Sequence, residues 1–350
     1  MENERKTEII VRSYFNKTSN KRHLAIPIWI IFLTIIVVGC HKTIDGTETQ
    51  ETGLFHKNIT IDAITRRYAY YVPKNLGNFP HPLVLSLHGG GIYIADMTGE
   101  SGHKTPYKIW MDIADIEKLI IVYPEGENGS YGKPTWNDCR ANSSVSSTAA
   151  DVNFINSLID KFSSEYHIDP NRIYASGMSN GGIMALRLAV ELSDKIAAVA
   201  AIGAAMPDRS ECGLPVNPIS VLFMNGTADN YLPYNGGTIS NPPNPDHGTI
   251  FSTEESVNIW TTFDQTDTIP VVYNFPDIDT RDNSTVTRYT YSNGVEGTEV
   301  ILYKVVGSGH SAPSIQEQYS WLFEHYFGKQ NHDIEMAKEV WNFLKKKTLH

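Results

Sequence analysis

The chain of 350 residues contains, in sequence order, a serine, an aspartate and a histidine that are each placed for nucleophilic chemistry. Ser179 lies in the pattern Gly-x-Ser-x-Gly at residues 177–181, after the apolar run 173–175 and before the helix-forming stretch 183–192. Between a strand and a helix, this pattern predicts a tight turn that exposes the serine hydroxyl and directs the unpaired first amides of the helix toward it. We therefore expect Ser179 to be a nucleophile.

A serine nucleophile needs a base that accepts its proton and an acid that orients the base. Asp229 follows the apolar run 218–224 and a glycine turn, and His310 follows the apolar run 300–306 and Gly-Ser-Gly. Because the carboxyl ends of parallel strands meet at one edge of a sheet, both side chains can reach the serine. Taken singly, the aspartate could be a turn residue or helix cap, and the histidine a solvated loop residue. Their order and their positions at strand ends predict that Asp229 is the acid and His310 the base.

A glycine-rich segment is placed to stabilise negative charge on a substrate. The strand-like run 82–87 leads into His88 and the three glycines 89–91. Such a loop can bring a backbone N–H close to a substrate oxygen, because no side chain intrudes. We expect the N–H groups of Gly90 and of Asn180, the residue after the serine, to form an oxyanion hole. The alternative is a plain glycine turn.

Apolar periodicity predicts the elements that hold these residues in place. The alternation over 59–71 is typical of an antiparallel edge strand, and the proline-rich stretch 234–250 indicates a loop that could border the cleft. The other expected elements are buried strands at 119–123 and 197–202, helices at 150–166, 253–263 and 333–346, and a hairpin of 285–291 with 298–306. Strands and helices alternate around Ser179, which predicts a doubly wound, mostly parallel α/β sheet with helices on both faces.

The amino terminus has the features of an export signal. Basic residues at 21–23 precede the apolar run 24–38, which ends at Gly39 and Cys40. This run is shorter than the roughly 20 residues that a spanning helix needs, although an uncleaved membrane anchor is an alternative. The arrangement resembles a bacterial lipoprotein signal, in which Cys40 would be lipidated.

This resemblance divides the chain into three parts. We expect residues 1–39 to be a lipoprotein-type signal peptide, 40–54 a flexible tether, and 55–350 an α/β catalytic domain. The protein would then be exported and lipid-anchored to the bacterial cell envelope, on the periplasmic side or the cell surface, or otherwise be secreted. Contact with a membrane would occur only through the lipid at Cys40.

Composition limits the partners and cofactors. The formal net charge is −10, which argues against nucleic acid or an anionic surface as a partner. Hydrophobic residues make up 41% of the chain, enough to fill the core of one α/β domain. The sequence has neither zinc-ligand spacing nor a Gly-x-x-x-x-Gly-Lys phosphate loop, so we expect no metal and no organic cofactor.

Longer motifs around these residues resemble one family. They are Leu-His-Gly-Gly at 87–90, Val-Tyr-Pro-Glu-Gly at 122–126, Trp-Asn at 136–137, Gly-Met-Ser-Asn-Gly-Gly at 177–182, Gly-Thr-Ala-Asp at 226–229, Pro-Tyr-Asn-Gly-Gly at 233–237, Gly-Ser-Gly-His at 307–310 and the tail 333–343. The chain is similar to α/β-hydrolase esterases of the polyhydroxybutyrate depolymerase-like group, which overlaps the feruloyl and acetylxylan esterases of carbohydrate esterase family one. The resemblance covers roughly residues 55 to 346. It implies the α/β-hydrolase fold and the roles of Ser179, Asp229 and His310 given above.

Two positions depart from the family pattern. Asn225 stands where the family usually has His, and Ser-Ala-Pro at 311–313 follows the base where the family often has an aromatic residue. These changes leave the three catalytic residues in place. They bear on the shape of the pocket and so on the substrate.

The family also suggests a disulfide. Its members often carry a cysteine near Cys139 and near Cys212, and an exported compartment would permit these two to pair. The alternative is two unpaired buried thiols. Separately, Trp136 could stack on a sugar or aryl ring of the substrate, or it could pack a loop.

These features predict an exported serine carboxylesterase that hydrolyses ester bonds through an acyl-enzyme. The resemblance implies feruloyl or acetyl esters on polysaccharides as substrates. The alternatives are a polyhydroxyalkanoate (polyhydroxybutyrate) depolymerase or a hydrolase of short hydroxyacid oligomers, a serine peptidase on the same fold, and a non-catalytic surface-binding lipoprotein.

Overall fold

The computed structural model describes residues 51–213, 215–239 and 247–349. The expected signal peptide, the lipidated Cys40 and nearly all of the expected tether lie outside the described residues. Within the described ranges, no helix is both long and apolar enough to cross a membrane. The first described strand starts at Gly53, inside the range that we expected to be tether.

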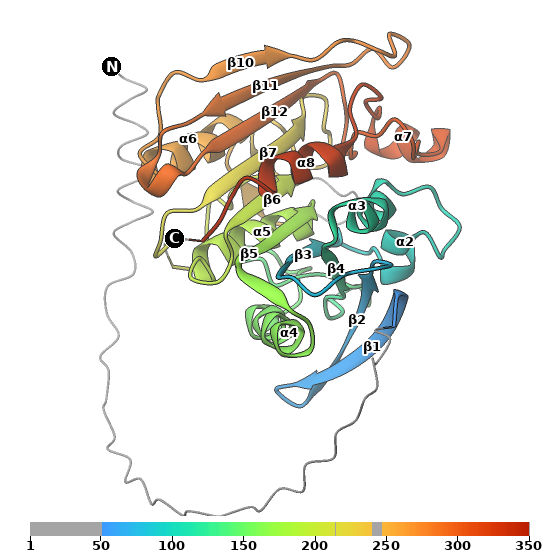
Figure 1. Cartoon of the computed structure of the whole chain (residues 1–350). Helices are drawn as coiled ribbons and strands as arrows, with labels where there is room; N and C mark the ends of the chain where they lie inside the picture. The colour runs from blue at the N-terminus through green and yellow to red at the C-terminus, as the bar shows by residue number, and fades with distance from the viewer. Residues whose placement is uncertain (1–50, 214, 240–246, 350) are drawn as a thin grey trace, which may run out of the picture. The chain divides into compact units, whose positions relative to one another are not determined.

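Ten strands form one sheet with the order β1-β2-β4-β3-β5-β6-β7-β12-β11-β10 (Figure 1). The central strands from β4 to β12 run parallel, and antiparallel strands extend the sheet at each edge. The mostly parallel sheet predicted from the sequence is thus confirmed. In chain order the strands are β1 (Gly53–Ile61), β2 (Ile64–Val72), β3 (His81–Leu87), β4 (Ile120–Pro124), β5 (Ile168–Met178), β6 (Ala198–Ile202), β7 (Ser220–Gly226), β10 (Val271–Asn274), β11 (Thr285–Tyr291) and β12 (Val300–Val306).

Helices cover both faces of this sheet, as predicted (Figure 1). On one face, α3 (Ile109–Glu117) and α8 (Met336–Leu344) pack against each other. On the other lie α4 (Asp151–Glu165), α5 (Asn180–Glu191) and α6 (Thr253–Phe263). The shorter elements are the helices α2 (Ile94–Thr98) and α7 (Trp321–Phe327), the 3₁₀ turns Pro106–Lys108 and Val295–Gly297, and the strand pair β8 (Gly237–Thr238) and β9 (Thr249–Ile250).

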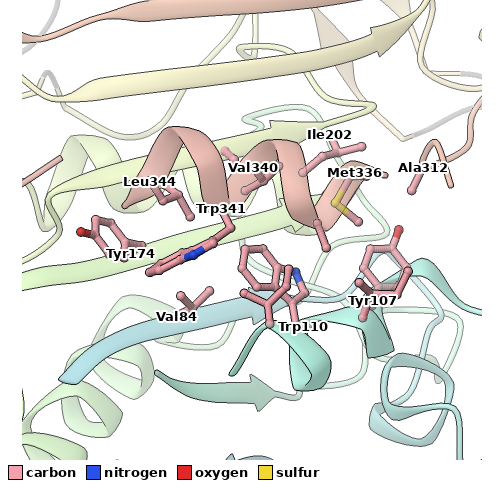
Figure 2. Close-up of a cluster of buried hydrophobic side chains, with 14 of the residues drawn as sticks. Val84, Tyr107, Trp110, Tyr174, Ile202, Ala312, Met336, Val340, Trp341 and Leu344 are labelled. Carbon is pink, nitrogen blue, oxygen red and sulfur yellow. The ribbon is translucent and has the colours of Figure 1, made fainter. Parts of the chain in front are cut away.

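The core beneath α3 and α8 is built from large apolar side chains (Figure 2). Trp110 of α3 and Trp341 of α8 are both buried, and the ring of Trp341 meets that of Tyr174 on β5 edge to face, with the centroids 6.1 Å apart. Val84 of β3 and Ile202 of β6 belong to the same cluster. Because the central strands are buried on both faces, they read as continuous apolar runs. This packing fixes the strands whose carboxyl ends carry the site.

The edge of the sheet differs from the prediction. We expect one strand over 59–71, but the structure has the hairpin of β1 and β2, joined by Asp62 and Ala63. These two residues have φ values of 50° and 63°. Two successive positive φ angles are what a two-residue hairpin turn of type I′ requires. Since neither residue is glycine, the sequence gives little sign of the turn.

Candidate active site

Ser179 lies at the junction of β5 and α5, in a tight turn like the one that the sequence predicts. Its backbone has φ 57° and ψ −126°, a strained conformation for a residue other than glycine. The turn depends on small residues: a Cβ at Gly177 would collide with the backbone of Gly181, and a Cβ at Gly181 would collide with the carbonyl of His88. The N–H of Ser179 donates to the carbonyl of Ile202 at 2.8 Å, which ties the turn to β6.

Asp229 and His310 follow two neighbouring parallel strands, β7 and β12. Nδ1 of His310 lies 2.6 Å from Oδ2 of Asp229, and both side chains are buried. The other carboxylate oxygen, Oδ1, accepts the N–H groups of Tyr231 and Leu232, each at 2.8 Å. These bonds fix the carboxylate as the acceptor of Nδ1–H, which leaves a lone pair on Nε2 of the imidazole.

One cavity of about 960 Å³ is lined by Ser179, Asn180, Gly90 and His310. Asp229 does not line this cavity and contacts it through His310. The structure thus brings together all the residues predicted for the nucleophile, the base, the acid and the oxyanion hole.

His88 holds the glycine loop that follows β3. Its Nδ1 lies 2.7 Å from the carbonyl oxygen of Gly89, and its Nε2 lies 2.9 Å from the backbone nitrogen of Gly126. Because the N–H of Gly126 can only donate, Nε2 must be the acceptor and Nδ1 must carry the proton. The imidazole is therefore neutral. Burial lowers the pKa of His88 to about 4, which favours the same neutral form.

The residues expected to form the oxyanion hole, Gly90 and Asn180, line the same cavity as Ser179. A Cβ built on Gly90 would be 3.8 Å from Cβ of Asn180, and a Cβ built on Gly89 would be 3.6 Å from Cβ of Ser179. In the part of the chain that the structure describes, neither Gly90 N–H nor Asn180 N–H donates to another protein group. Since both residues line the cavity, these N–H groups remain the candidates for binding a substrate oxygen.

Trp136 does not line the cavity, and the prediction that it stacks on a substrate ring is wrong. The side chain is 0% exposed, and its Nε1–H donates to the carbonyl of His88 at 2.9 Å. Its ring centroid lies 4.8 Å from that of the His88 imidazole. A buried indole needs an acceptor for its N–H, and the loop carbonyl supplies one. Trp136 therefore packs a loop, which is the alternative that the sequence left open.

The segment after Trp136 holds the side chain of Asn180. Oδ1 of Asn180 accepts the N–H of Trp136 at 2.7 Å, and Nδ2 donates to Oδ2 of Asp138 at 2.6 Å. Asp138 is paired with Arg140 at 2.8 Å, and both side chains are buried. The network fixes the first residue of α5. Sequence analysis missed Asp138 and Arg140, and the available signal was their place directly after the Trp-Asn motif.

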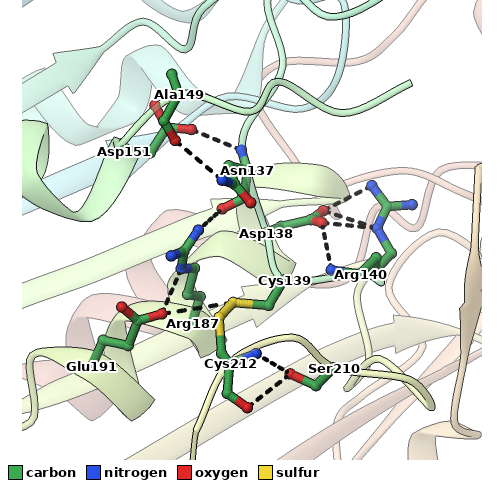
Figure 3. The surroundings of a disulfide bond; sticks show 10 residues. All are labelled: Asn137, Asp138, Cys139, Arg140, Ala149, Asp151, Arg187, Glu191, Ser210 and Cys212. Atoms are coloured by element: carbon green, nitrogen blue, oxygen red, sulfur yellow. Dashed lines mark hydrogen bonds and ion pairs between the residues drawn. A yellow bond between two sulfur atoms is a disulfide. The ribbon is translucent and has the colours of Figure 1, made fainter. Parts of the chain in front are cut away.

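A disulfide joins Cys139 to Cys212, with the Cα atoms 5.5 Å apart (Figure 3). The N–H of Glu211 also donates to the carbonyl of Cys139 at 2.9 Å. Arg140, the next residue, lines the cavity. The pairing that the family resemblance suggests is therefore present, in place of two unpaired thiols, and the bond lies next to a residue of the cavity wall.

An aromatic wall that the sequence analysis did not identify faces the imidazole. The ring centroids of Tyr231 and Phe327 lie 5.0 Å and 6.3 Å from that of His310. Tyr319 and Phe323 stack on each other, with 4.1 Å between centroids, and line the same cavity. The signal in the sequence is the aromatic-rich run 319–327.

The two departures from the family pattern do not alter the cavity wall. Asn225 accepts the N–H of Ala204 at 3.1 Å and donates from Nδ2 to the hydroxyl of Thr253 at 2.8 Å. The hydroxyl of Ser311 donates to the carbonyl of Lys329 at 3.0 Å. Neither Asn225 nor Ser311 lines the cavity.

Comparison with known proteins gives the class. A model of the phospholipase/carboxylesterase family matches residues 80–242. The putative esterase NocK of Nocardia uniformis subsp. tsuyamanensis is 29% identical over 269 residues, which cover 73% of this chain and 73% of that protein. The bifunctional acetylxylan esterase/xylanase XynS20E of Neocallimastix patriciarum is 29% identical over 72% of this chain. Feruloyl esterase B of Piromyces equi is 32% identical over 46% of this chain.

The matched region spans 32% of XynS20E and 28% of feruloyl esterase B, so both relatives extend well beyond it. The fold and these matches together define a class of enzyme, the α/β-hydrolases. Within that class, residues 80–242 match the phospholipase/carboxylesterase family, and the relatives named above are carboxylic ester hydrolases.

Proposed function

We propose that this protein is a serine carboxylesterase that cleaves feruloyl or acetyl esters of polysaccharides through an acyl-enzyme on Ser179. The observation that carries the proposal is the buried Asp229–His310 pair, which reaches the same cavity as a serine held in a strained strand-to-helix turn.

In the first step, neutral His310 accepts the proton of Ser179 as the hydroxyl oxygen attacks the ester carbonyl. Asp229 keeps the proton of the imidazole on Nδ1 and stabilises the imidazolium that forms. The N–H groups of Gly90 and Asn180 bind the oxygen on which negative charge develops, and such a donor is typically worth about 3–4 kcal/mol in the transition state.

His310 then gives its proton to the departing alcohol, and the acyl group remains on Ser179. Water attacks the acyl-enzyme with His310 again as the base, which releases the acid and restores the serine. All these proton transfers use Nε2, because Nδ1 is committed to Asp229.

The aromatic wall supports the choice of substrate. A feruloyl group presents a planar ring, which can stack on or meet the edges of rings such as Tyr231 and Phe327. The cavity of about 960 Å³ is within the range of pockets that enclose a small organic molecule. The names of XynS20E and feruloyl esterase B point to acetyl and feruloyl esters. Hydroxybutyrate oligomers are the alternative substrate, because a short polyester also fits an apolar cavity.

The nucleophile is tested by Ser179→Ala, with Ser164→Ala on the exposed side of α4 as the control. We expect Ser179→Ala to lower kcat by at least about 10³-fold and to abolish labelling by a fluorophosphonate probe. The control should behave like the wild type. Labelling and activity that both survive in Ser179→Ala would overturn the assignment.

The substrate is tested by comparing kcat/KM on methyl ferulate, acetylated xylan, p-nitrophenyl acetate, p-nitrophenyl butyrate and hydroxybutyrate oligomers. We expect methyl ferulate or acetylated xylan to be preferred. A clear preference for the oligomers would favour the depolymerase alternative instead.

Export and anchoring form a separate part of the proposal and rest on the sequence around Cys40 alone. We expect the native protein to partition into detergent, and Cys40→Ser to block lipidation and signal cleavage. The lipid anchor would be refuted if the mature protein did not partition into detergent and mass spectrometry showed that its first residue is not Cys40.

A further inference from the structure

Helix α7 directs aromatic side chains to two different places. Phe323 and Phe327 line the cavity, and the carbonyl of Phe327 accepts the N–H of His310 at 2.6 Å. Trp321 is 75% exposed, Tyr326 71% and Leu322 50%. A helix of seven residues thus borders the base on one side and offers large apolar groups to solvent on the other.

The exposed side of α7 is continuous with the cavity. Leu322 and Tyr326 are both exposed and cavity-lining, so the apolar surface runs from the interior over the rim. His325 extends it, with its ring centroid 5.3 Å from Tyr326 and 6.3 Å from Trp321. Exposed apolar surface of this kind, next to a cavity, is typical of ligand-binding grooves.

Other residues hold α7 in place. The hydroxyl of Ser320 accepts the N–H of Phe323 at 3.3 Å at the start of the helix, and Tyr319 stacks on Phe323. At its end, Glu324 accepts the N–H of Gln330 at 3.1 Å. The fold therefore does not depend on the exposed rings of Trp321 and Tyr326, and their exposure calls for another reason.

We propose that Trp321 and Tyr326 form a platform that binds sugar rings of a polysaccharide whose ester group occupies the cavity. A pyranose ring has an apolar face of C–H groups that packs on an aromatic ring, and hydroxyls at its edge that need polar partners. The rim supplies such partners, because His103, Lys104 and Gln318 also line the opening. A polyester chain has only carbonyl and ester oxygens along its length, which can accept hydrogen bonds from these side chains but cannot donate to them.

This platform rests on the proposed esterase function and assigns a site for the part of the substrate that does not react. Binding energy from that part lowers KM for the polymer and leaves the chemical step on a small ester unchanged. Loss of the platform should therefore lower kcat/KM more for polymeric substrates than for small ones. Loss of a catalytic residue would lower both alike.

The test compares Trp321→Ala/Tyr326→Ala with two reference variants. Tyr273→Ala removes an exposed ring on β10, and Trp321→Phe/Tyr326→Phe keeps both rings of the platform. We expect the alanine pair to reduce kcat/KM about tenfold more on acetylated xylan than on p-nitrophenyl acetate, because the small ester has no sugar rings to bind the platform. Both reference variants should match the wild type. An equal fall in kcat/KM on both substrates would overturn the proposal. It would mean that the substitutions had shifted α7 and so disturbed His310, and had not removed a site for sugar rings.

Binding is measured separately by affinity electrophoresis in xylan gels, with every variant also carrying Ser179→Ala. We expect the alanine pair to lose retardation by xylan and the phenylalanine pair to keep it. Unchanged retardation in the alanine pair would refute the platform, as would binding to polyhydroxybutyrate particles without binding to xylan. Because this readout needs no catalysis, it stands even if Ser179 proves not to be the nucleophile.

Discussion

Burial of His88 should make the stability of this protein depend on pH. The pKa of His88 is lowered from 6.5 to about 4, because the folded protein buries the imidazole and uses Nε2 to accept the N–H of Gly126. Between these values the unfolded chain binds a proton that the folded protein does not. The contribution of His88 to the free energy of unfolding therefore falls as the pH falls from about 6.5 to about 4. A lowering of 2.5 units at 1.36 kcal/mol each gives a loss of about 3 kcal/mol.

The measurement is urea unfolding between pH 7.5 and pH 4.5 for the wild type and for His88→Gln. Glutamine stays neutral over this range, so the variant should lack the contribution of His88 to the pH slope. His88→Gln should be less stable than the wild type at pH 7.5, because the glutamine side chain does not reproduce both hydrogen bonds of the imidazole ring. The difference in the free energy of unfolding between the two proteins should become smaller as the pH falls. His103→Gln, at an exposed position, is the control and should keep the wild-type slope. Equal slopes for the wild type and His88→Gln would refute the reasoning.

Three further predictions concern other buried groups. Replacing Cys139 and Cys212 by serine should lower the free energy of unfolding by about 4 kcal/mol in urea titrations, because the bond closes a 73-residue loop; no change would contradict this. Burial raises the pKa of Asp264 from 3.8 to about 7, so the folded state keeps a proton that the unfolded chain loses, and the contribution of Asp264 to stability falls as the pH rises through this window. Asp264→Asn should therefore gain about 3 kcal/mol relative to the wild type between pH 5 and pH 8, and a constant difference would count against it. Asp138→Asn should reduce kcat about tenfold with little change in KM. The substitution weakens the charge-assisted hydrogen bond from Asn180, and such a bond is worth about 1.5–3 kcal/mol. Steady-state kinetics with an unchanged kcat would argue against a positioning role for Asp138.

Local structure can be predicted best from the sequence where a short pattern of residues is compatible with only one backbone conformation. The Gly-x-Ser-x-Gly pattern leads to the turn at Ser179, since its glycines are the residues that avoid a collision. Helix α6 has the predicted bounds, 253–263, because Ser252 and Glu255 form a capping box that marks its start. Asp229 and His310 could be singled out as candidates because each follows an apolar run.

Features that depend on long-range contacts were missed. Whether Trp136 faces solvent or the interior is decided by the loop of His88, which lies 48 positions away in sequence. The exposed strand β10 has four residues, too few for a clear alternation. The aromatic residues of α7 would suit a core helix equally well, and only the surrounding fold leaves some of them exposed.

The bond between Asp229 and His310 has a consequence for the order in which the protein matures. The two residues are 81 positions apart, so their contact closes a long stretch of chain. Contacts of this kind form late in folding, because the chain loses the most conformational freedom to make them. The turn of Ser179 needs only the adjoining β5 and α5 and the nearby β6. During synthesis, a chain that has not yet reached Val300 therefore carries the proposed nucleophile without the proposed base, and the proposed hydrolysis would begin only when β12 has joined the sheet.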